Sequence, residues 1–184
     1  VEEEVILDDF IISLRIAKMG YRVAYAPDAY AMETASFSMK EEHKRKVRIC
    51  AGGFQAIVKL RSLLNFLRYP ALSFQYISHR VLRWTLSPLS LPILLVSNIL
   101  LLLNGGGWFY QAIFAMQVLF YAAAWGGYFM TLQNRRMKLL YIPYYFLFMN
   151  VAVYEGFFRF IGRRQPSTWE KAVRVQEKIS DISI

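Results

Sequence analysis

The stretch from Trp84 to Asn134 contains no charged residue of either sign. Its first part, residues 84–103, is long enough for a helix to cross a hydrocarbon core of about 30 Å. A glycine-rich turn, "NGGG" at 104–107, separates it from a second apolar run over 108–131. Aromatic residues open that run, as is typical of a membrane interface. The stretch therefore predicts a transmembrane hairpin.

The charges outside this stretch predict an orientation. The chain has 184 residues, of which 56% are hydrophobic and 19% charged, whereas soluble domains carry about 25% charge. Between Glu42 and Glu155 there are twelve Lys or Arg residues and no acid. Basic loops stay on the cytoplasmic side, so segment 43–83 and the loop 133–138 are expected there. The sequence predicts a multi-pass protein of the cell (inner or plasma) membrane.

A third apolar stretch, residues 139–161, contains Pro143 and Glu155. If it crosses fully, the basic tail 162–184 lies outside, against its charge. If it is broken and re-enters, the tail stays in the cytoplasm, which we favour. Glu155 fits either a functional acid within the membrane or an ion pair with Arg159 one turn later, which is the more common arrangement.

Residues 54–83 predict amphipathic helices at the membrane surface. Pro70 divides the segment, and basic residues border an apolar stripe of Ile57, Leu60, Leu64 and Leu67. A basic amphipathic segment directly before a membrane span is expected to lie among anionic headgroups. The alternative is a helix that packs on a soluble domain.

Residues 1–53 have the pattern of a soluble protein. A helix is expected over 8–19, with Phe10, Ile11, Leu14 and Ala17 on one face and Gly20 as its end. "YRVAYAP", residues 21–27, alternates like a short strand. A Ser-rich link then leads into a basic helix. The chain opens in mid-pattern, without Met or a signal peptide, so we expect a fragment of a longer protein. Cys50, the single cysteine, is expected to be a packed residue in a reducing compartment.

Two charged groups carry the candidate chemistry. Asp8 and Asp9 stand at the start of the first helix, where carboxylates also serve as simple caps. Arg45, Lys46 and Arg48 precede two adjacent glycines, which allow the backbone either to turn or to be approached closely. A solvated basic face is the alternative for this cluster.

The order of these motifs resembles the membrane-integrated family 2 glycosyltransferases, which include the cellulose, hyaluronan and poly-N-acetylglucosamine synthases. Leu7-Asp8-Asp9 stand where that family has T-E-D, and "SLRIAKMGYRVAYAP" follows as in its catalytic domain. The family's Q-x-x-R-W reads here Arg45-Lys46-Val47-Arg48-Ile49. A membrane hairpin and a tail similar to the family's, from Gly162 to Lys171, complete the likeness over nearly the whole chain.

The resemblance implies a mainly α membrane protein. Residues 1–53 would be the C-terminal part of an α/β GT-A catalytic domain, followed by interfacial helices (54–83) and a transmembrane region (84–161). Asp9 would accept the proton of the attacking hydroxyl, and Asp8 would orient the acceptor. Arg48, with Arg45 and Lys46, would bind the diphosphate of the leaving group. This activity places residues 1–53 in the cytoplasm.

The resemblance also implies partners and a cofactor. A nucleotide-sugar would be the donor and a glycan or lipid-linked molecule the acceptor, beside a lipid bilayer and without nucleic acid. Mg²⁺ or Mn²⁺ is implied, with its main ligands upstream of this chain, so that the 184 residues would be inactive alone. Because only the arginine of Q-x-x-R-W is kept, polymer synthesis is less strongly indicated than sugar transfer itself.

Other functions remain open at this stage. The chain fits a non-enzymatic transporter or secretion subunit with a basic cytoplasmic face, although transporters usually show inverted repeats and broken helices. Within the enzyme class, transfer of one sugar to a lipid carrier competes with polymer synthesis. Polar and aromatic side chains in the apolar stretch either line a glycan path or, more commonly, pack between helices: Asn98, Gln111, Gln117, Tyr121, Trp125 and Tyr128.

Overall fold

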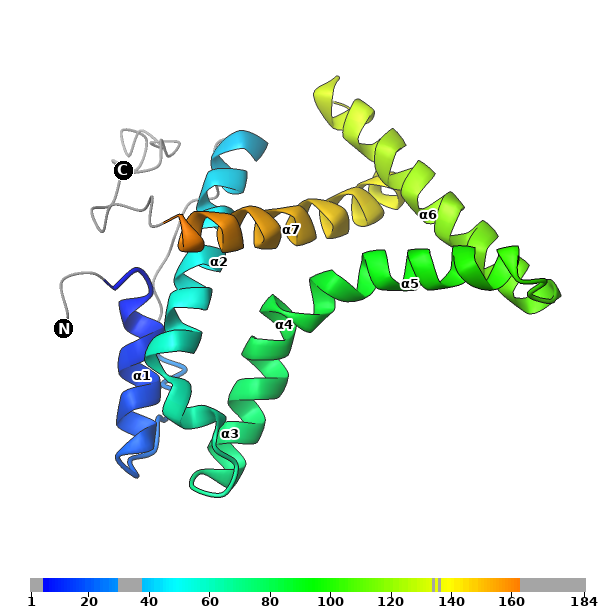
Figure 1. Ribbon diagram of the computed structural model, residues 1–184. Helices are drawn as coiled ribbons and strands as arrows, with labels where there is room; N and C mark the ends of the chain where they lie inside the picture. Colours follow the sequence, from blue (N-terminus) through cyan, green and yellow to red (C-terminus); the bar gives the residue numbers. More distant parts are fainter. Residues whose placement is uncertain (1–4, 30–37, 134, 136, 163–184) are drawn as a thin grey trace, which may run out of the picture. The chain divides into compact units, whose positions relative to one another are not determined.

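A computed structural model describes residues 5–29, 38–133, 135 and 137–162. These residues are mostly helical and contain no strand. The helices (Figure 1) are α1 (Asp8–Lys18), α2 (Met39–Lys59), the 3-10 helix η1 (Arg61–Leu64), α3 (Pro70–Tyr76), the π-helix η2 (Ile77–Val81), α4 (Leu82–Trp84), α5 (Leu86–Leu103), α6 (Trp108–Leu132) and α7 (Lys138–Ile161). The predicted α membrane architecture agrees with this helical content, while the α/β remnant stays a prediction.

The chain forms two compact units, whose boundaries fall inside α3 and α7. Unit 1 comprises the residues up to Ser73 together with those from Gly156 onward, and unit 2 comprises Phe74–Glu155. Four predicted segments lie wholly or partly outside the described residues: the first four residues, the link around Glu33, the loop 133–138, and the tail beyond Gly162.

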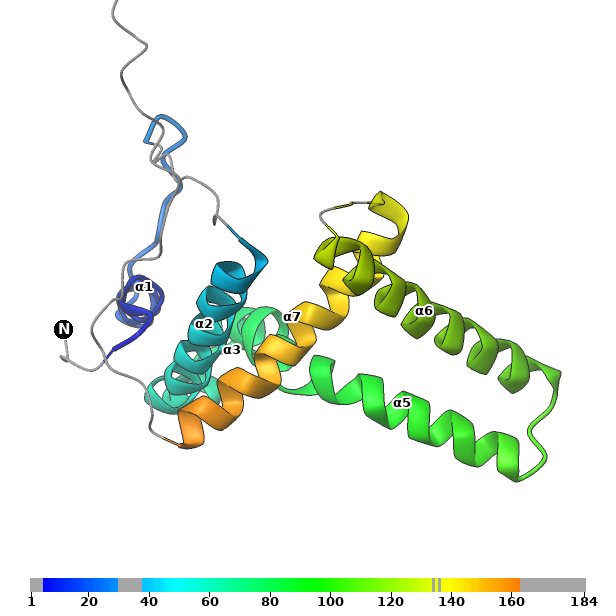
Figure 2. The same cartoon turned by 90° about the horizontal axis from the view of Figure 1, so that it is seen from above.

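In unit 1, α1 lies beside α2 (Figures 1 and 2). On the predicted face of α1, Ile11 is buried, and Phe10, Leu14 and Ala17 are half-buried. Gly20 follows the helix with a φ of 92°. Only glycine adopts that conformation without strain. On α2 the buried residues recur with helical spacing: Val47, Cys50, Ala51 and Phe54. Cys50 is thus a packed residue, as expected.

The last turns of α7 complete this core. Gly156 lies so close to α2 that an added Cβ would stand 2.6 Å from Cβ of Cys50 and 2.9 Å from the backbone nitrogen of Ala51. Phe157 then meets Phe54 edge to face, with 5.2 Å between the ring centroids. The missing side chain at Gly156 therefore allows α7 to pack directly on α2.

In unit 2, α5 and α6 form a hairpin closed by the predicted glycine turn (Figure 2). Backbone N–H groups of Gly105 and Gly106 donate to the carbonyls of Leu102 (3.2 Å) and Leu101 (2.8 Å), and Gly105 has a φ of 81°. This pattern ends α5 where the sequence predicted. Both helices are long and apolar enough to cross a membrane; α7, the third predicted crossing, is not one of these two.

Polar groups connect the helices of unit 2. Asn98, buried on α5, donates from Nδ2 to Oε1 of Gln117 on α6 at 3.2 Å. Pro92 has no N–H to offer the carbonyl of Pro88 one turn earlier, and the Tyr154 hydroxyl donates to that carbonyl at 2.7 Å. Asn98 and Gln117 thus pair between helices, which favours packing over a glycan path at these two positions.

Two sequence predictions are wrong. Residues 21–27 are exposed, irregular chain rather than a strand, because a strand needs a neighbour to accept its backbone hydrogen bonds and no other strand is present in the described ranges. The third apolar stretch, expected to be broken if it re-enters, is one continuous helix, α7, with Pro143 inside it. Pro143 lies in the second turn of α7, where it removes one backbone hydrogen bond without ending the helix.

Candidate functional site

The acid pair opens α1. Asp8 and Asp9 are both exposed in its first turn. Oδ1 of Asp8 accepts a hydrogen bond from the backbone N–H of Asp9 at 3.0 Å, and Oδ1 of Asp9 accepts one from Phe10 at 2.7 Å. The carboxylates thus satisfy N–H groups that a helix start leaves open. Both carboxylates are thus hydrogen-bonded at the helix start and remain exposed to solvent.

The basic cluster lies on α2, whose start is well defined. Oγ of Ser38 caps the helix by accepting from the backbone N–H of Glu41 at 3.3 Å. Glu41 and Glu42 occupy the first turn, where negative charge is favourable. Arg45 is exposed, while Lys46 and Arg48 are half-buried. The cluster therefore stands on a rigid helix and not in a loop.

A close contact joins the acid pair to this helix. An added Cβ at Gly52 would lie 2.8 Å from Cγ of Leu7 and 2.9 Å from Cγ2 of Ile6. The backbone N–H of Ile6 also donates to Oε1 of Gln55 at 3.1 Å. The residues that lead directly into Asp8 are thus held against α2, and a side chain at position 52 would have to displace them.

The helical repeat places the arginines on the side of α2 that makes this contact. Arg45, Arg48, Gly52 and Gln55 follow one another at intervals of three or four residues, so they share one face. Arg48 stands one turn before Gly52. The structure therefore brings the segment of Asp8 and Asp9 to the face of α2 that carries Arg45 and Arg48.

Lys46 is placed differently. Its Nζ lies 3.3 Å from Oε1 of Glu42, one turn earlier on the same helix, and Lys44 pairs in the same way with Glu41 at 3.0 Å. Position 46 also lies well round the helix from position 52. Of the three predicted basic residues, Lys46 thus lies farthest round the helix from Gly52, and it pairs with an acid of its own helix.

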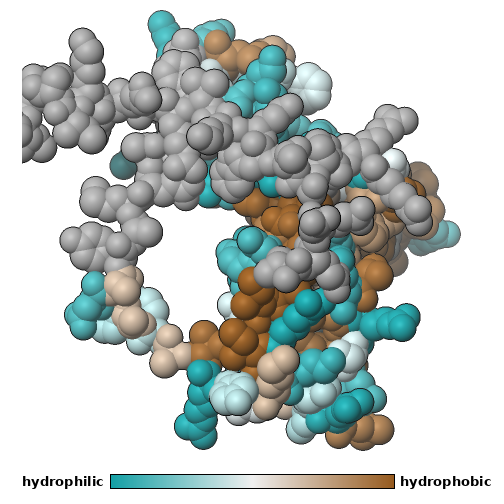
Figure 3. Space-filling model, turned by 90° about the vertical axis from the view of Figure 1, so that its left-hand side faces the viewer, coloured by the Kyte–Doolittle hydropathy of each residue, from teal (hydrophilic) through white to brown (hydrophobic). Residues whose placement is uncertain are grey.

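An apolar groove that the sequence did not suggest runs along α1. It has a volume of about 250 Å³ and is lined by Val5, Asp8, Ile11, Ile12, Arg15, Ile16 and Met19. Ile12, Ile16 and Met19 recur at helical spacing and are exposed, which was the available signal. The groove places an apolar surface beside Asp8. Figure 3 shows that hydrophobic and hydrophilic side chains lie next to each other on the surface of the molecule.

The described residues do not form a metal site by themselves. They contain no group of three or more His, Cys, Asp or Glu side chains that could hold an ion. Asp8 and Asp9 offer carboxylate oxygens, which suit Mg²⁺, but that ion takes near-octahedral coordination. The two residues fall short of such a ligand set, and the implied Mg²⁺ or Mn²⁺ therefore takes no part in the steps proposed below.

Comparisons with protein-family models, with curated proteins and with solved structures find no match to this chain. The resemblance to the glycosyltransferases thus depends on the motifs quoted above, and the site depends on the contacts around Gly52.

Proposed function

We propose that this chain is the C-terminal part of a membrane-bound inverting glycosyltransferase of family 2. The longer protein moves a sugar from a nucleotide-sugar to a glycan or a lipid-linked acceptor for the cell envelope or surface. The catalytic part faces the cytoplasm, where nucleotide-sugars are made, and the apolar helices cross the membrane. The 184 residues alone are inactive, because the nucleotide-binding and metal-binding residues lie upstream.

The proposed chemistry needs one base and one cationic surface. The acceptor hydroxyl attacks the anomeric carbon, its proton passes to the carboxylate of Asp9, and the bond from that carbon to the diphosphate oxygen breaks. Negative charge develops on the departing diphosphate, and Arg48 with Arg45 stabilises it. Asp8 orients the acceptor.

The observation that supports this proposal best is the contact of Ile6 and Leu7 with Gly52 and Gln55. It relates two motifs that are far apart in the sequence and brings them to one face of α2. A capping role alone gives no reason for the acid pair to be held at the face with the arginines. A base and a diphosphate-binding surface must be adjacent, because both act on the same anomeric carbon.

The direct test is transfer of labelled sugar by membranes containing the longer protein. Asp9→Asn keeps the size of the side chain and removes the base, so we expect turnover to fall by about 10²–10⁴-fold, with expression and membrane insertion unchanged. Asp28→Asn is the matched control, because Asp28 is an exposed acid in the same unit. Full activity of Asp9→Asn would remove Asp9 from the mechanism.

Arg48→Gln tests the other half of the site. Loss of a cation at the diphosphate should weaken donor binding and slow departure of the leaving group, while Lys46→Gln should have a much smaller effect because position 46 lies well round the helix from Gly52. If none of a panel of nucleotide-sugars is consumed by the longer wild-type protein, the proposal fails, and the transporter or secretion subunit becomes the better hypothesis. Product size then separates single transfer from polymer synthesis.

A further inference from the structure

The apolar stripe predicted for the membrane surface is divided by the fold. Helix α2 ends at Lys59, and the chain continues through η1. Leu60 is buried within unit 1, as is the neighbouring Leu63, whereas Leu67 is 97% exposed. The stripe is therefore not one lipid-facing surface. Its first part belongs to the protein core, and the exposed apolar surface moves to the turn at 65–69.

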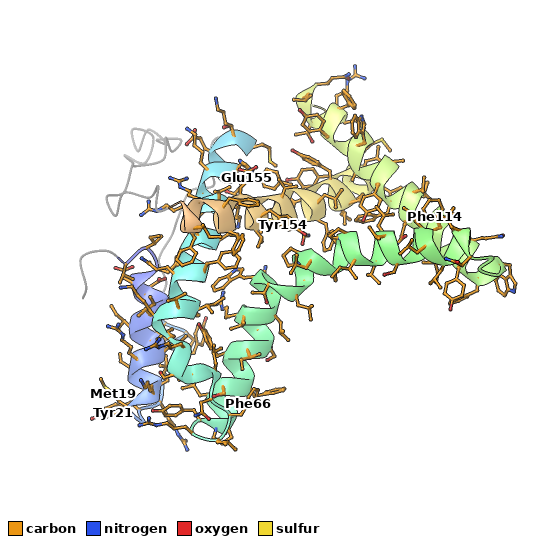
Figure 4. The ribbon with its side chains drawn as sticks, viewed as in Figure 1. Met19, Tyr21, Phe66, Phe114, Tyr154 and Glu155 are labelled. Carbon is orange, nitrogen blue, oxygen red and sulfur yellow. The ribbon has the colours of Figure 1, made fainter. Side chains whose placement is uncertain are left out.

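This turn holds two large apolar side chains in solvent. Phe66 is 48% exposed beside Leu67, and Figure 4 shows Phe66 at the same end of unit 1 as the exposed side chains of Met19 and Tyr21. Removal of these apolar side chains from water is favourable. The tip therefore fits a surface that removes it from water.

The turn is preorganised. Oδ1 of Asn65 accepts from the backbone N–H groups of Leu67 (3.0 Å) and Arg68 (3.3 Å). The hydroxyl of Ser73, which is fully buried, donates to the backbone carbonyl of Asn65 at 3.1 Å. The exposure of Phe66 and Leu67 thus belongs to a fixed conformation, stabilised at both ends of the turn, and binding requires no further ordering of its backbone.

The charges around the tip indicate its partner. Arg61 and Arg68 flank it and are exposed, and the guanidinium of Arg68 lies over the ring of Tyr69, 5.5 Å from the centroid. From Leu60 to Tyr69 the chain carries no acid. Cations around a protruding apolar tip match a bilayer, in which anionic phosphates lie above the acyl chains. In the same chain α5 and α6 are able to cross a membrane.

We propose that the turn 65–69 is a contact site for an anionic lipid bilayer. Phe66 and Leu67 enter the boundary between headgroups and acyl chains, while Arg61 and Arg68 lie among the lipid phosphates. The element that contacts the membrane is thus a structured turn and not the face of an amphipathic helix. This inference is independent of sugar transfer.

The experiment uses the 184-residue chain in lipid nanodiscs, with Cys50→Ala to remove its only thiol. Leu67→Cys carries an environment-sensitive fluorophore, and Tyr25→Cys is the matched control, since Tyr25 is 89% exposed in the same unit. We expect the label at 67 to be quenched by spin-labelled lipid and shielded from iodide, and the label at 25 to behave in the opposite way. Circular dichroism checks that each variant keeps its helices.

Two outcomes would overturn the proposal. A label at 67 that iodide reaches as easily as at 25 would place the turn in water, and shielding from both quenchers would mean that protein covers it.

Lipid charge gives a separate test. Adding phosphatidylglycerol to phosphatidylcholine should increase quenching of the label at 67 by lipid. Arg68→Gln should reduce this increase about fivefold, which is the contribution of one basic residue near an anionic surface. Equal quenching in both lipids would contradict the role of the arginines.

Discussion

Helix α2 of unit 1 and helices α5 and α6 of unit 2 place their apolar side chains differently. Unit 1 is built like a soluble protein: α2 places Val47, Cys50 and Phe54 inside and its charged residues outside. In unit 2 the apolar windows of α5 and α6 are only 11% buried, although polar Asn98 and Asn150 are inside. Core helices of a soluble protein would be mostly buried, so the exposed apolar surface of unit 2 favours a lipid environment.

The comparison teaches that hydrophobicity alone does not locate a core. In unit 1 apolar side chains pack against one another, because water drives them together. In lipid that drive is absent, and helices associate through close backbone approach and interhelical hydrogen bonds. Unit 2 shows both kinds of contact. Helix α7 approaches α6 closely at Gly127, and Asn98 of α5 donates a hydrogen bond to Gln117 of α6. The predictions below are ordered by expected effect.

A lysine on the apolar surface gives the largest difference between the units. Leu119, on α6, is 70% exposed, and Met19, just after α1, is 73% exposed. In lipid, Leu119→Lys should cost about 3 kcal/mol of insertion free energy, whereas Met19→Lys should leave insertion of the hairpin unchanged because Met19 lies outside the two membrane-length helices. Glycosylation mapping of the hairpin in microsomes measures the inserted fraction. Equal insertion of both variants would mean that α6 does not lie in a bilayer.

A methyl group at Gly127 tests the packing inside unit 2. Its Cβ would collide with the backbone carbonyl of Leu140 and lie 2.8 Å from Cβ of Tyr144. Since a backbone carbonyl cannot rotate away, Gly127→Ala should destabilise unit 2 by about 1–3 kcal/mol. At Gly126 the nearest atom is 3.7 Å away, so Gly126→Ala should be neutral or gain about 1 kcal/mol of helix propensity. Thermal unfolding in detergent compares the two, and equal stability would refute the close approach of α7.

The same substitution in unit 1 should cost less. At Gly52 the added methyl meets side-chain atoms of Leu7 and Ile6, which can move in part, so we expect a net loss of about 1 kcal/mol after the gain in helix propensity. In the double variant, Leu7→Ala should restore most of the stability that Gly52→Ala loses, because the two positions are in contact. Additive effects of the two substitutions in thermal unfolding would show that they do not touch.

Local signals in the sequence predicted much of the fold. The ends of α5 and α6 follow from uncharged runs and a glycine turn, and α1 follows from the spacing of Phe10, Ile11, Leu14 and Ala17. The strand over 21–27 failed because strands depend on a neighbour that alternation cannot supply. The stripe through Leu60 and Leu67 failed because α2 ends at Lys59, which rotates the later residues away from the earlier ones.

The site was predictable only as separate parts. The two adjacent glycines indicated a close approach, and the structure shows it at Gly52 with Ile6 and Leu7. No spacing in the sequence identified the partner, since such contacts join residues far apart in the chain. Lys46 could have been separated from Arg48 by a local signal, because Glu42 stands one helical turn before it. The helical repeat, measured from Gly52, then places the arginines on the contact face.

The smallest effect concerns a part of unit 2 that is buried in the manner of unit 1. Tyr76, on α3, is 2% exposed, and burial raises its pKa to about 12. Between pH 10 and 12 the unfolded chain ionises this phenol while the folded chain keeps it neutral, so its contribution to stability is complete below pH 10 and lost as pH rises through 12. Tyr76→Phe should therefore flatten the alkaline fall in stability. Tyr25→Phe, at an exposed position, is the control, and equal slopes would mean that Tyr76 is solvated.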